Sequence, residues 1–242
     1  MTFDAPRLSF SHAVAAPRRP HRVAFAATIG GSPVDQETEN ICRDSMRNFK
    51  NVGSTVEEIT IDLEDLEDTF LALRSQEFVI DRELQLQRYR DQIKPDIIWN
   101  TELGLEQSIP TLAKAERARA ALYMQFNELF SQYDLIVTPG ANTPAFDVEL
   151  RYPEAIDGIK LEHYMAASTL TAAVTISASP ALSLPCGFDQ YGRPIGLQLI
   201  GRPRGEAALL AAGALFEVES GLAEQVPIDP RHGKVPPMGK LT

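Results

Sequence analysis

Residues 179–203 read SPALSLPCGFDQYGRPIGLQLIGRP, a pattern of two apolar runs separated by a turn. The runs are ALSLP at 181–185 and IGLQLIG at 195–201, and the turn is DQYG at 189–192. Gly, Asp and other turn-forming residues between two apolar runs are typical of a tight connection between strands. We therefore expect two neighbouring strands here, within a larger sheet.

The first third of the chain predicts a strand, a helix and a second strand. VAFAATIG at 23–30 is a short apolar run closed by glycines, which is typical of a buried strand. Residues 32–53 form a helical pattern with Asp35 as the expected N-cap, and residues 56–63 restart a strand pattern. Because a helical crossover joins strands that run in the same direction, we expect a parallel pair.

Helices continue to alternate with strands toward the C-terminus. Residues 64–92 carry apolar side chains near helical spacing, and we expect Pro95 to stop that helix. Residues 111–133 are rich in good helix formers and lead directly into the apolar strand residues 135–137. A final helix is predicted over residues 206–221. This order of elements places the chain in the α/β class.

One uncharged run, from Tyr164 to Phe188, is long enough to suggest a membrane span. A helix that crosses a bilayer needs roughly 20 apolar residues. However, Pro180 and Pro185 interrupt helical hydrogen bonding, and serines and threonines are frequent in the run. We therefore interpret this run as part of a folded core, and we expect no membrane partner.

Composition and charge exclude other classes of function. The chain has 242 residues, of which 44% are hydrophobic and 23% are charged, values that are ordinary for a globular domain. Its 23 basic and 33 acidic residues give a net charge of −10, which repels phosphate backbones and anionic membranes. Nucleic acid is therefore not an expected partner. Without a secretory signal or a disulfide pattern, the expected location is cytoplasmic.

The cysteines and histidines match no pattern that binds a metal. Cys42 and Cys186 fit no zinc or disulfide spacing, and the four histidines are scattered without an HExxH motif. Cys186 ends a buried strand and has no basic neighbour in sequence, so we expect a packed, inert thiol. His163 could reach a pocket, but a structural role is favoured. No metal site is predicted.

Several motifs in the second half of the chain occur together in one known family. YDLIVTPG at 133–140 and PALSLPCGFDQYGRPIGLQLIGRPRGEAALLAAGALFE at 180–217 are similar in order and spacing to the C-terminal half of the amidase signature family. The resemblance extends over roughly residues 18–219. It implies an α/β fold with a mixed, largely parallel sheet flanked by helices, and neither a metal nor an organic cofactor.

The same resemblance implies amide hydrolysis by a Ser, cis-Ser, Lys triad in a complete enzyme. The family places its catalytic segment before the strand that begins at Val23 and its lysine earlier still, whereas the first lysine of this chain is Lys50. The sequence Gly30-Gly31-Ser32 echoes part of a Gly-Gly-Ser motif, but a turn from strand to helix explains it better. We therefore expect no catalytic residue here, and an inactive chain when it is alone.

Small hydroxyl residues are the candidates for a substrate pocket. By the resemblance, this half of the fold helps to wall the substrate cleft, and the irregular segment 141–163 has the composition of a loop that can shape a pocket. Many relatives carry Asn and Gly where this chain has Thr175 and Ala178, which leaves the type of amide open. The candidate pocket residues are Thr138, Ser168, Thr171, Thr175 and Ser177.

Two functions fit this sequence. The first is the C-terminal portion of an amidase signature hydrolase that cleaves the carbon–nitrogen bond of a small carboxylic amide when complete. The alternative is a free-standing, non-catalytic binding or assembly protein derived from half of that fold. Because half of a large sheet leaves an unpaired edge, both predict self-association or a missing N-terminal half. The expected organisation is an extended lead at 1–20, a single incomplete α/β domain at 21–236 and a tail at 237–242.

Overall fold

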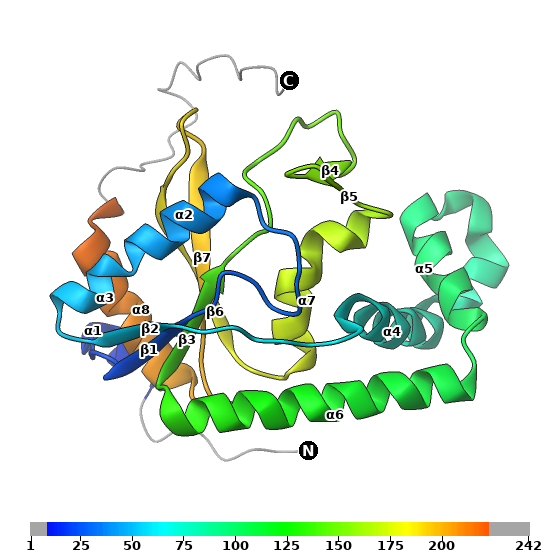
Figure 1. Ribbon diagram of the computed structural model, residues 1–242. Helices are drawn as coiled ribbons and strands as arrows, with labels where there is room; N and C mark the ends of the chain where they lie inside the picture. The colour runs from blue at the N-terminus through cyan, green and yellow to red at the C-terminus, as the bar shows by residue number, and fades with distance from the viewer. Residues whose placement is uncertain (1–8, 223–242) are drawn as a thin grey trace.

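A five-stranded sheet forms the centre of residues 9–222, the part of the chain that this computed structural model describes (Figure 1). In chain order its strands are β1 (Arg22–Phe25), β2 (Thr55–Glu58), β3 (Leu135–Pro139), β6 (Ala181–Phe188) and β7 (Pro194–Ile200). The spatial order is β2-β1-β3-β7-β6, with β1 parallel to β2 and β3, and β7 antiparallel to β3 and β6. Four of these five strands therefore point the same way, which confirms the predicted mixed, largely parallel sheet.

Each face of the sheet packs against its own set of helices (Figure 1). These are α2 (Gln36–Ser45), α3 (Arg47–Asn51) and α8 (Glu206–Ser220) on one face, and α4 (Leu66–Tyr89), α6 (Ile109–Gln132) and α7 (Thr169–Ile176) on the other. Val23 belongs to the first core and its neighbour Ala24 to the second. Successive side chains of a strand point to opposite faces, so one short strand supplies both cores.

The junction between β1 and α2 has the predicted features. Gly30 and Gly31 adopt the left-handed region, with φ of +59° and +69°, as the expected turn from strand to helix requires. The Asp35 carboxylate accepts a hydrogen bond from the Thr38 backbone N–H at 2.8 Å and caps α2. The predicted helix over 32–53 is interrupted at Met46, which separates α2 from α3.

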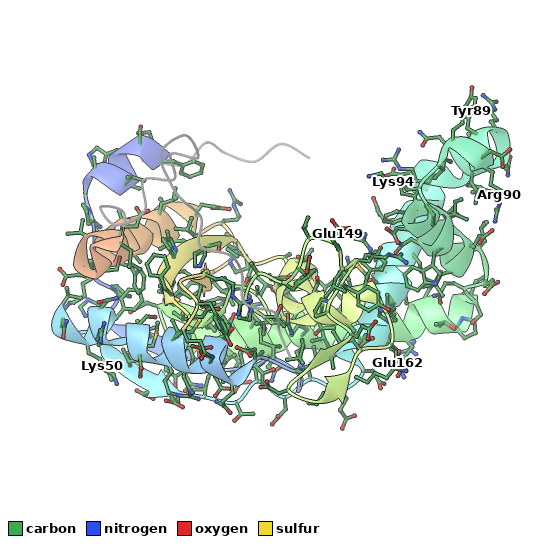
Figure 2. The ribbon with its side chains drawn as sticks, turned by 90° about the horizontal axis from the view of Figure 1, so that it is seen from above. Lys50, Tyr89, Arg90, Lys94, Glu149 and Glu162 are labelled. Carbon is green, nitrogen blue, oxygen red and sulfur yellow. The ribbon has the colours of Figure 1, made fainter. Side chains whose placement is uncertain are left out.

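Pro95 corrects one sequence expectation. The helix predicted over 64–92 is present as α4, followed by a short 3-10 segment, η1 (Arg90–Gln92). Pro95 then begins a further helix, α5 (Pro95–Leu105), instead of only stopping the previous one. Proline suits this first position because its missing N–H would have no partner inside the helix. Figure 2 shows Tyr89, Arg90 and Lys94 at the end of the α4–α5 hairpin that lies farthest from the sheet.

Two segments expected to be irregular contain regular structure. Helix α1 (Phe10–Ala15) lies within the expected extended lead 1–20 and packs against α8, while residues 1–8 lie outside the described residues. The expected loop 141–163 contains a small hairpin of β4 (Ala155–Ile156) and β5 (Ile159–Lys160). The expected tail at 237–242 also lies outside the described residues.

The uncharged run 164–188 is part of the core, as predicted. It contains a 3-10 segment, η2 (Tyr164–Ser168), then α7 and β6. Leu170 and Ala173 of α7 are fully buried in the second core. Within residues 9–222, no helix is long and apolar enough to cross a membrane.

Candidate functional site

A cavity of about 500 Å³ opens at the carboxyl end of β3. Open α/β sheets bind their ligands beyond the carboxyl ends of parallel strands, because the connecting loops diverge there. Its walls come from the start of α2, the loop after β3, η2 and the start of β7. The lining residues used below are Thr38, Asn142, Ala145, Arg151, Tyr164, Ser168 and Ile195.

The loop after β3 is fixed on the side that faces α2. The Asn142 side chain is almost completely buried, and its Nδ2 donates a hydrogen bond to the Pro33 carbonyl at 2.7 Å. The Asn142 carbonyl in turn accepts from the Asp35 backbone N–H at 2.8 Å. The residue that caps α2 therefore also holds this wall of the cavity. The expectation that segment 141–163 shapes a pocket is consistent with this arrangement.

The opposite end of the same loop is held by the β6–β7 turn. Arg193 Nη1 donates to the Ala145 carbonyl at 2.7 Å, and Arg193 Nε donates to the buried Asp189 carboxylate at 2.5 Å. The Asp189 carboxylate also accepts the backbone N–H groups of Tyr191 and Arg193. Burial alone would raise the pKa of Asp189, but these hydrogen bonds together lower it below its ordinary value.

Aromatic and charged side chains form the wall next to the α4–α5 hairpin. The Tyr164 hydroxyl accepts a hydrogen bond from Asn100 Nδ2 at 2.6 Å, and the ring of Trp99 lies 5.8 Å from the Tyr164 ring. The Arg151 guanidinium lies 5.3 Å from the centre of the same ring and forms an ion pair with Asp96. This wall can therefore contact a polar ligand through a cation and an aromatic face.

His163 has the structural environment that was favoured for it. Its Nε2 lies 2.9 Å from a carboxylate oxygen of Glu67, and its ring lies 5.6 Å from the ring of Trp99. It connects η2 to α4 and α5, next to the Tyr164 wall. In residues 9–222, no group of three His, Cys, Asp or Glu side chains is arranged to hold a metal ion.

Two of the five candidate pocket residues have clear positions. Ser168 is half-buried and lines the cavity. Thr138 is fully buried instead: its hydroxyl accepts a hydrogen bond from Gln198 Nε2 at 2.8 Å and donates to the Pro139 carbonyl at 3.0 Å. Thr138 therefore contributes to the interior of the sheet and does not line this cavity.

The other three candidates lie along α7 and its end. Their hydroxyl groups donate to carbonyl oxygens one turn earlier: Thr171 to Ser168 at 3.0 Å, Thr175 to Thr171 at 3.1 Å and Ser177 to Val174 at 2.7 Å. None of the three lines this cavity. Their hydroxyl groups already donate hydrogen bonds to backbone carbonyls of the helix. The assignment of these three residues to a substrate cleft stays a prediction.

Sequence reasoning missed Tyr164 and Arg151. Arg151 is the only basic residue between positions 141 and 159. A single cation in a loop that is expected to shape a pocket could have indicated a ligand-binding residue. Tyr164 gave no such signal, because its position depends on Asn100, which is 64 residues away in sequence.

The two cysteines meet in the core although they are 144 residues apart in sequence. Their Sγ atoms are 3.6 Å apart, and both residues are buried free thiols. The neighbouring Cys186 thiol and burial raise the pKa of Cys42 strongly. Cys186 is also a buried free thiol, and the inert role expected for it stays a prediction.

The contacts of serine and lysine side chains bear on whether this chain holds a catalytic pair. Ser32 lies in the turn before α2, where its hydroxyl is buried without a hydrogen-bond partner. In residues 9–222 no lysine donates a hydrogen bond to a serine, and Lys114 instead pairs with Asp65 at 2.6 Å. The cavity at the end of β3 is lined by polar side chains within this part of the chain, and the expected absence of a catalytic residue stays a prediction.

The fold is a mixed α/β sheet flanked by helices, with a cavity at the carboxyl end of β3. The family model described as Amidase matches residues 2–210, and the chain belongs to this family. The resemblance seen in the sequence motifs is thereby confirmed.

Curated relatives agree with this assignment. The chain is 28% identical over 233 residues to a glutamyl-tRNA(Gln) amidotransferase subunit from Lactiplantibacillus plantarum, covering 81% of this chain and 44% of the relative. The subunit of the same name from Levilactobacillus brevis is 34% identical over 169 residues, covering 69% of this chain and 30% of the relative. The chain thus spans less than half the length of these relatives.

Among solved structures, a bacterial aryl acylamidase of the amidase signature family superposes with a TM-score of 0.79 at 21% identity, over 90% of this chain and 47% of that one. A 6-aminohexanoate cyclic dimer hydrolase superposes with a TM-score of 0.74 at 16% identity, over 90% of this chain and 49% of that one. At these identities the likeness establishes the fold.

Proposed function

We propose that this chain is the C-terminal portion of an amidase-family hydrolase, and that it supplies one wall of the cleft that binds a small carboxylic amide. The observation that carries the proposal is the cavity at the carboxyl end of β3, in a chain that belongs to the Amidase family. In the complete enzyme the carbon–nitrogen bond of the amide is cleaved through an acyl-enzyme formed by residues outside this portion. A cytoplasmic location is part of the proposal.

The polar groups around the cavity fit an amide ligand. Ser168 brings a hydroxyl group, which can both donate and accept a hydrogen bond, and Tyr164 brings an aromatic face. Small-molecule sites combine mostly apolar walls with a few polar groups that fix orientation. A primary aromatic amide such as benzamide carries a ring and one amide group, so it is the appropriate probe.

The proposal predicts weak binding without hydrolysis. The purified chain is incubated with benzamide, and ammonia release is compared with a mock purification from cells that lack the gene. Binding is measured in parallel by ligand-detected NMR. We expect no ammonia above the mock level, and benzamide signals that broaden with the wild-type chain.

Variants locate the binding. We expect Tyr164→Ala and Ser168→Ala to weaken benzamide binding, and Ser131→Ala, at an exposed position of α6 outside the cavity, to leave it unchanged. Reproducible ammonia release that follows the wild-type protein through purification would refute the proposed inactivity. Benzamide binding that none of the cavity variants alters would refute the assignment of the cavity.

The alternative, a free-standing assembly protein, is favoured by one feature. Among the described residues β6 pairs only with β7 and forms one edge of the sheet, and its residues Ala181, Ser183 and Pro185 are exposed. An eight-residue edge strand presents unpaired N–H and C=O groups to another chain. This edge supports either self-association or pairing with a missing N-terminal half.

Light scattering separates the oligomer from the monomer. A stable dimer that a charged substitution at the edge, Ser183→Lys, converts to a monomer would support self-association through β6. A strictly monomeric wild-type chain at high protein concentration would contradict self-association. Pairing of the β6 edge with an N-terminal half would then be the interpretation that is left.

A further inference from the structure

A second cavity, of about 530 Å³, lies at the opposite end of the sheet. It is lined by α1, α8, the residues just before β1, the start of β3 at Leu135, and Gly201 and Arg202 after β7. The first cavity lies beyond the end of β3 at Pro139, so the length of the sheet separates the two. Neither the proposed amide cleft nor the known features of the fold account for this second cavity.

Small apolar side chains form the interior of this cavity. Ala13 of α1, Leu135 of β3 and Leu209 and Ala212 of α8 are all buried side chains in its wall. Alanines at the contact between α1 and α8 leave a space that larger side chains would fill. The volume lies within the range of about 300 to 1,000 Å³ that is typical of sites for small organic molecules.

The mouth of the cavity carries positive charge in a chain whose net charge is −10. Its arginine lining residues are Arg18, Arg19 and Arg202, and within residues 9–222 its one acidic lining residue is Asp134. The Asp134 carboxylate already accepts the backbone N–H groups of His21 and Arg22, at 2.8 and 3.1 Å.

Two of the arginines are available to a ligand. Arg19 Nη1 donates to the Gly53 carbonyl at 2.8 Å and is therefore directed toward the end of α3. The side chains of Arg18 and Arg202 are exposed and have no hydrogen-bond or ion-pair partner within residues 9–222. The start of α8 also lines the mouth, through its N-cap Gly205 and through Ala208, and there the positive end of the helix and the Glu206 carboxylate of the first turn act with opposite sign.

We propose that this second cavity binds a small organic anion with an apolar body, of which a medium-chain carboxylate is the simplest example. The charged group contacts Arg18 and Arg202 at the mouth, and the apolar body occupies the space between α1 and α8. A bare inorganic anion leaves the apolar wall unused, and a neutral alcohol leaves the arginines unpaired. The positive charge of the mouth and the apolar interior together favour a ligand that has both an anionic group and an apolar body.

Calorimetric titration of the 242-residue chain tests the class of ligand. Four probes are compared below their aggregation concentrations: hexanoate, octanoate, 1-octanol and inorganic phosphate. We expect octanoate to bind more tightly than hexanoate by about fifteenfold, because it buries two more methylenes and each contributes roughly a fourfold change in affinity. We expect octanol and phosphate each to bind at least about fivefold more weakly than octanoate. Octanol lacks the charge that pairs with the arginines, and phosphate lacks the apolar body that contacts the interior.

Variants test the location. The double substitution Arg18→Gln with Arg202→Gln is expected to weaken octanoate binding by up to about twenty-five-fold, because each exposed ion pair contributes up to about fivefold. Ala208→Leu, which places a larger side chain at the mouth without changing charge, is expected to abolish octanoate binding. Arg88→Gln, an exposed arginine near the end of α4, is the matched control and should bind octanoate as the wild type does.

Each result decides for or against the second cavity. Thermal melting of every variant shows whether it is folded, and Ala208→Leu tests the cavity independently if the double arginine variant unfolds. The expected ranking of probes, with loss of binding in both cavity variants, supports the proposal. Absent octanoate binding, phosphate that binds as tightly as octanoate, or binding that survives both cavity variants would overturn it.

Discussion

The guanidinium of Arg193 connects the buried carboxylate of Asp189 to the loop that walls the first cavity, through hydrogen bonds of 2.5 Å to Asp189 and 2.7 Å to the Ala145 carbonyl. The turn between β6 and β7 therefore positions a wall of the candidate site. The stability of the turn and the shape of the cavity are expected to change together.

Asp189→Asn is expected to lower the free energy of unfolding by about 2 kcal/mol, because the variant loses charge-assisted hydrogen bonds at a buried acceptor. It should also weaken benzamide binding, because Arg193 then holds Ala145 less firmly. Urea unfolding measures the first effect and ligand-detected NMR the second. Asp147→Asn, on an exposed residue of the same loop, is the control and should change stability by less than about 0.5 kcal/mol.

The contribution of Asp189 is expected to depend on pH in a defined direction. Its folded-state pKa is lowered, so the carboxylate stabilises the fold fully above its unfolded pKa, which is about 3.9, and this stabilisation is lost as pH falls through the folded value. The stability difference between wild type and Asp189→Asn should stay constant from pH 7 to about pH 5 and shrink below about pH 4. A difference that grows on acidification would contradict this assignment.

The buried pair formed by Thr138 and Gln198 predicts an asymmetric response to mutation. Thr138→Val keeps the shape but leaves Gln198 without its partner, and should cost about 1 to 3 kcal/mol in the free energy of unfolding. Thr138→Val combined with Gln198→Leu removes both polar groups and should recover part of that loss. Chemical unfolding of the single and double variants measures the coupling, and additive effects would show that the pair does not interact.

Gly104 permits the close packing of α4 and α5. A Cβ atom at this position would lie 2.2 Å from the Ser75 carbonyl oxygen, so the two helices would have to separate. Gly104→Ala is expected to destabilise the chain by about 1 to 3 kcal/mol through overpacking. Helix propensity alone predicts the opposite sign, a gain of about 1 kcal/mol, so the direction of the change in thermal unfolding decides between the two.

The sequence by itself determined the elements and their class. Asp35 before a run of helix formers, the glycines at 30 and 31, and the alternating run at 195–201 define local structure through capping, permitted backbone angles and side-chain periodicity, and all depend on near neighbours. The motifs of the β6–β7 hairpin also determined the family.

Only the tertiary structure decided which side chains share a site. Tyr164 meets Asn100 across 64 residues, and Thr138 uses its hydroxyl on Gln198 inside the sheet, where sequence reasoning had placed it in a pocket. Strand periodicity predicts that a residue faces one side of a sheet, but which partners cover that side depends on helices that return from distant parts of the chain. The fold could therefore be predicted from local patterns, whereas the cavities arise from long-range contacts that no local pattern encodes.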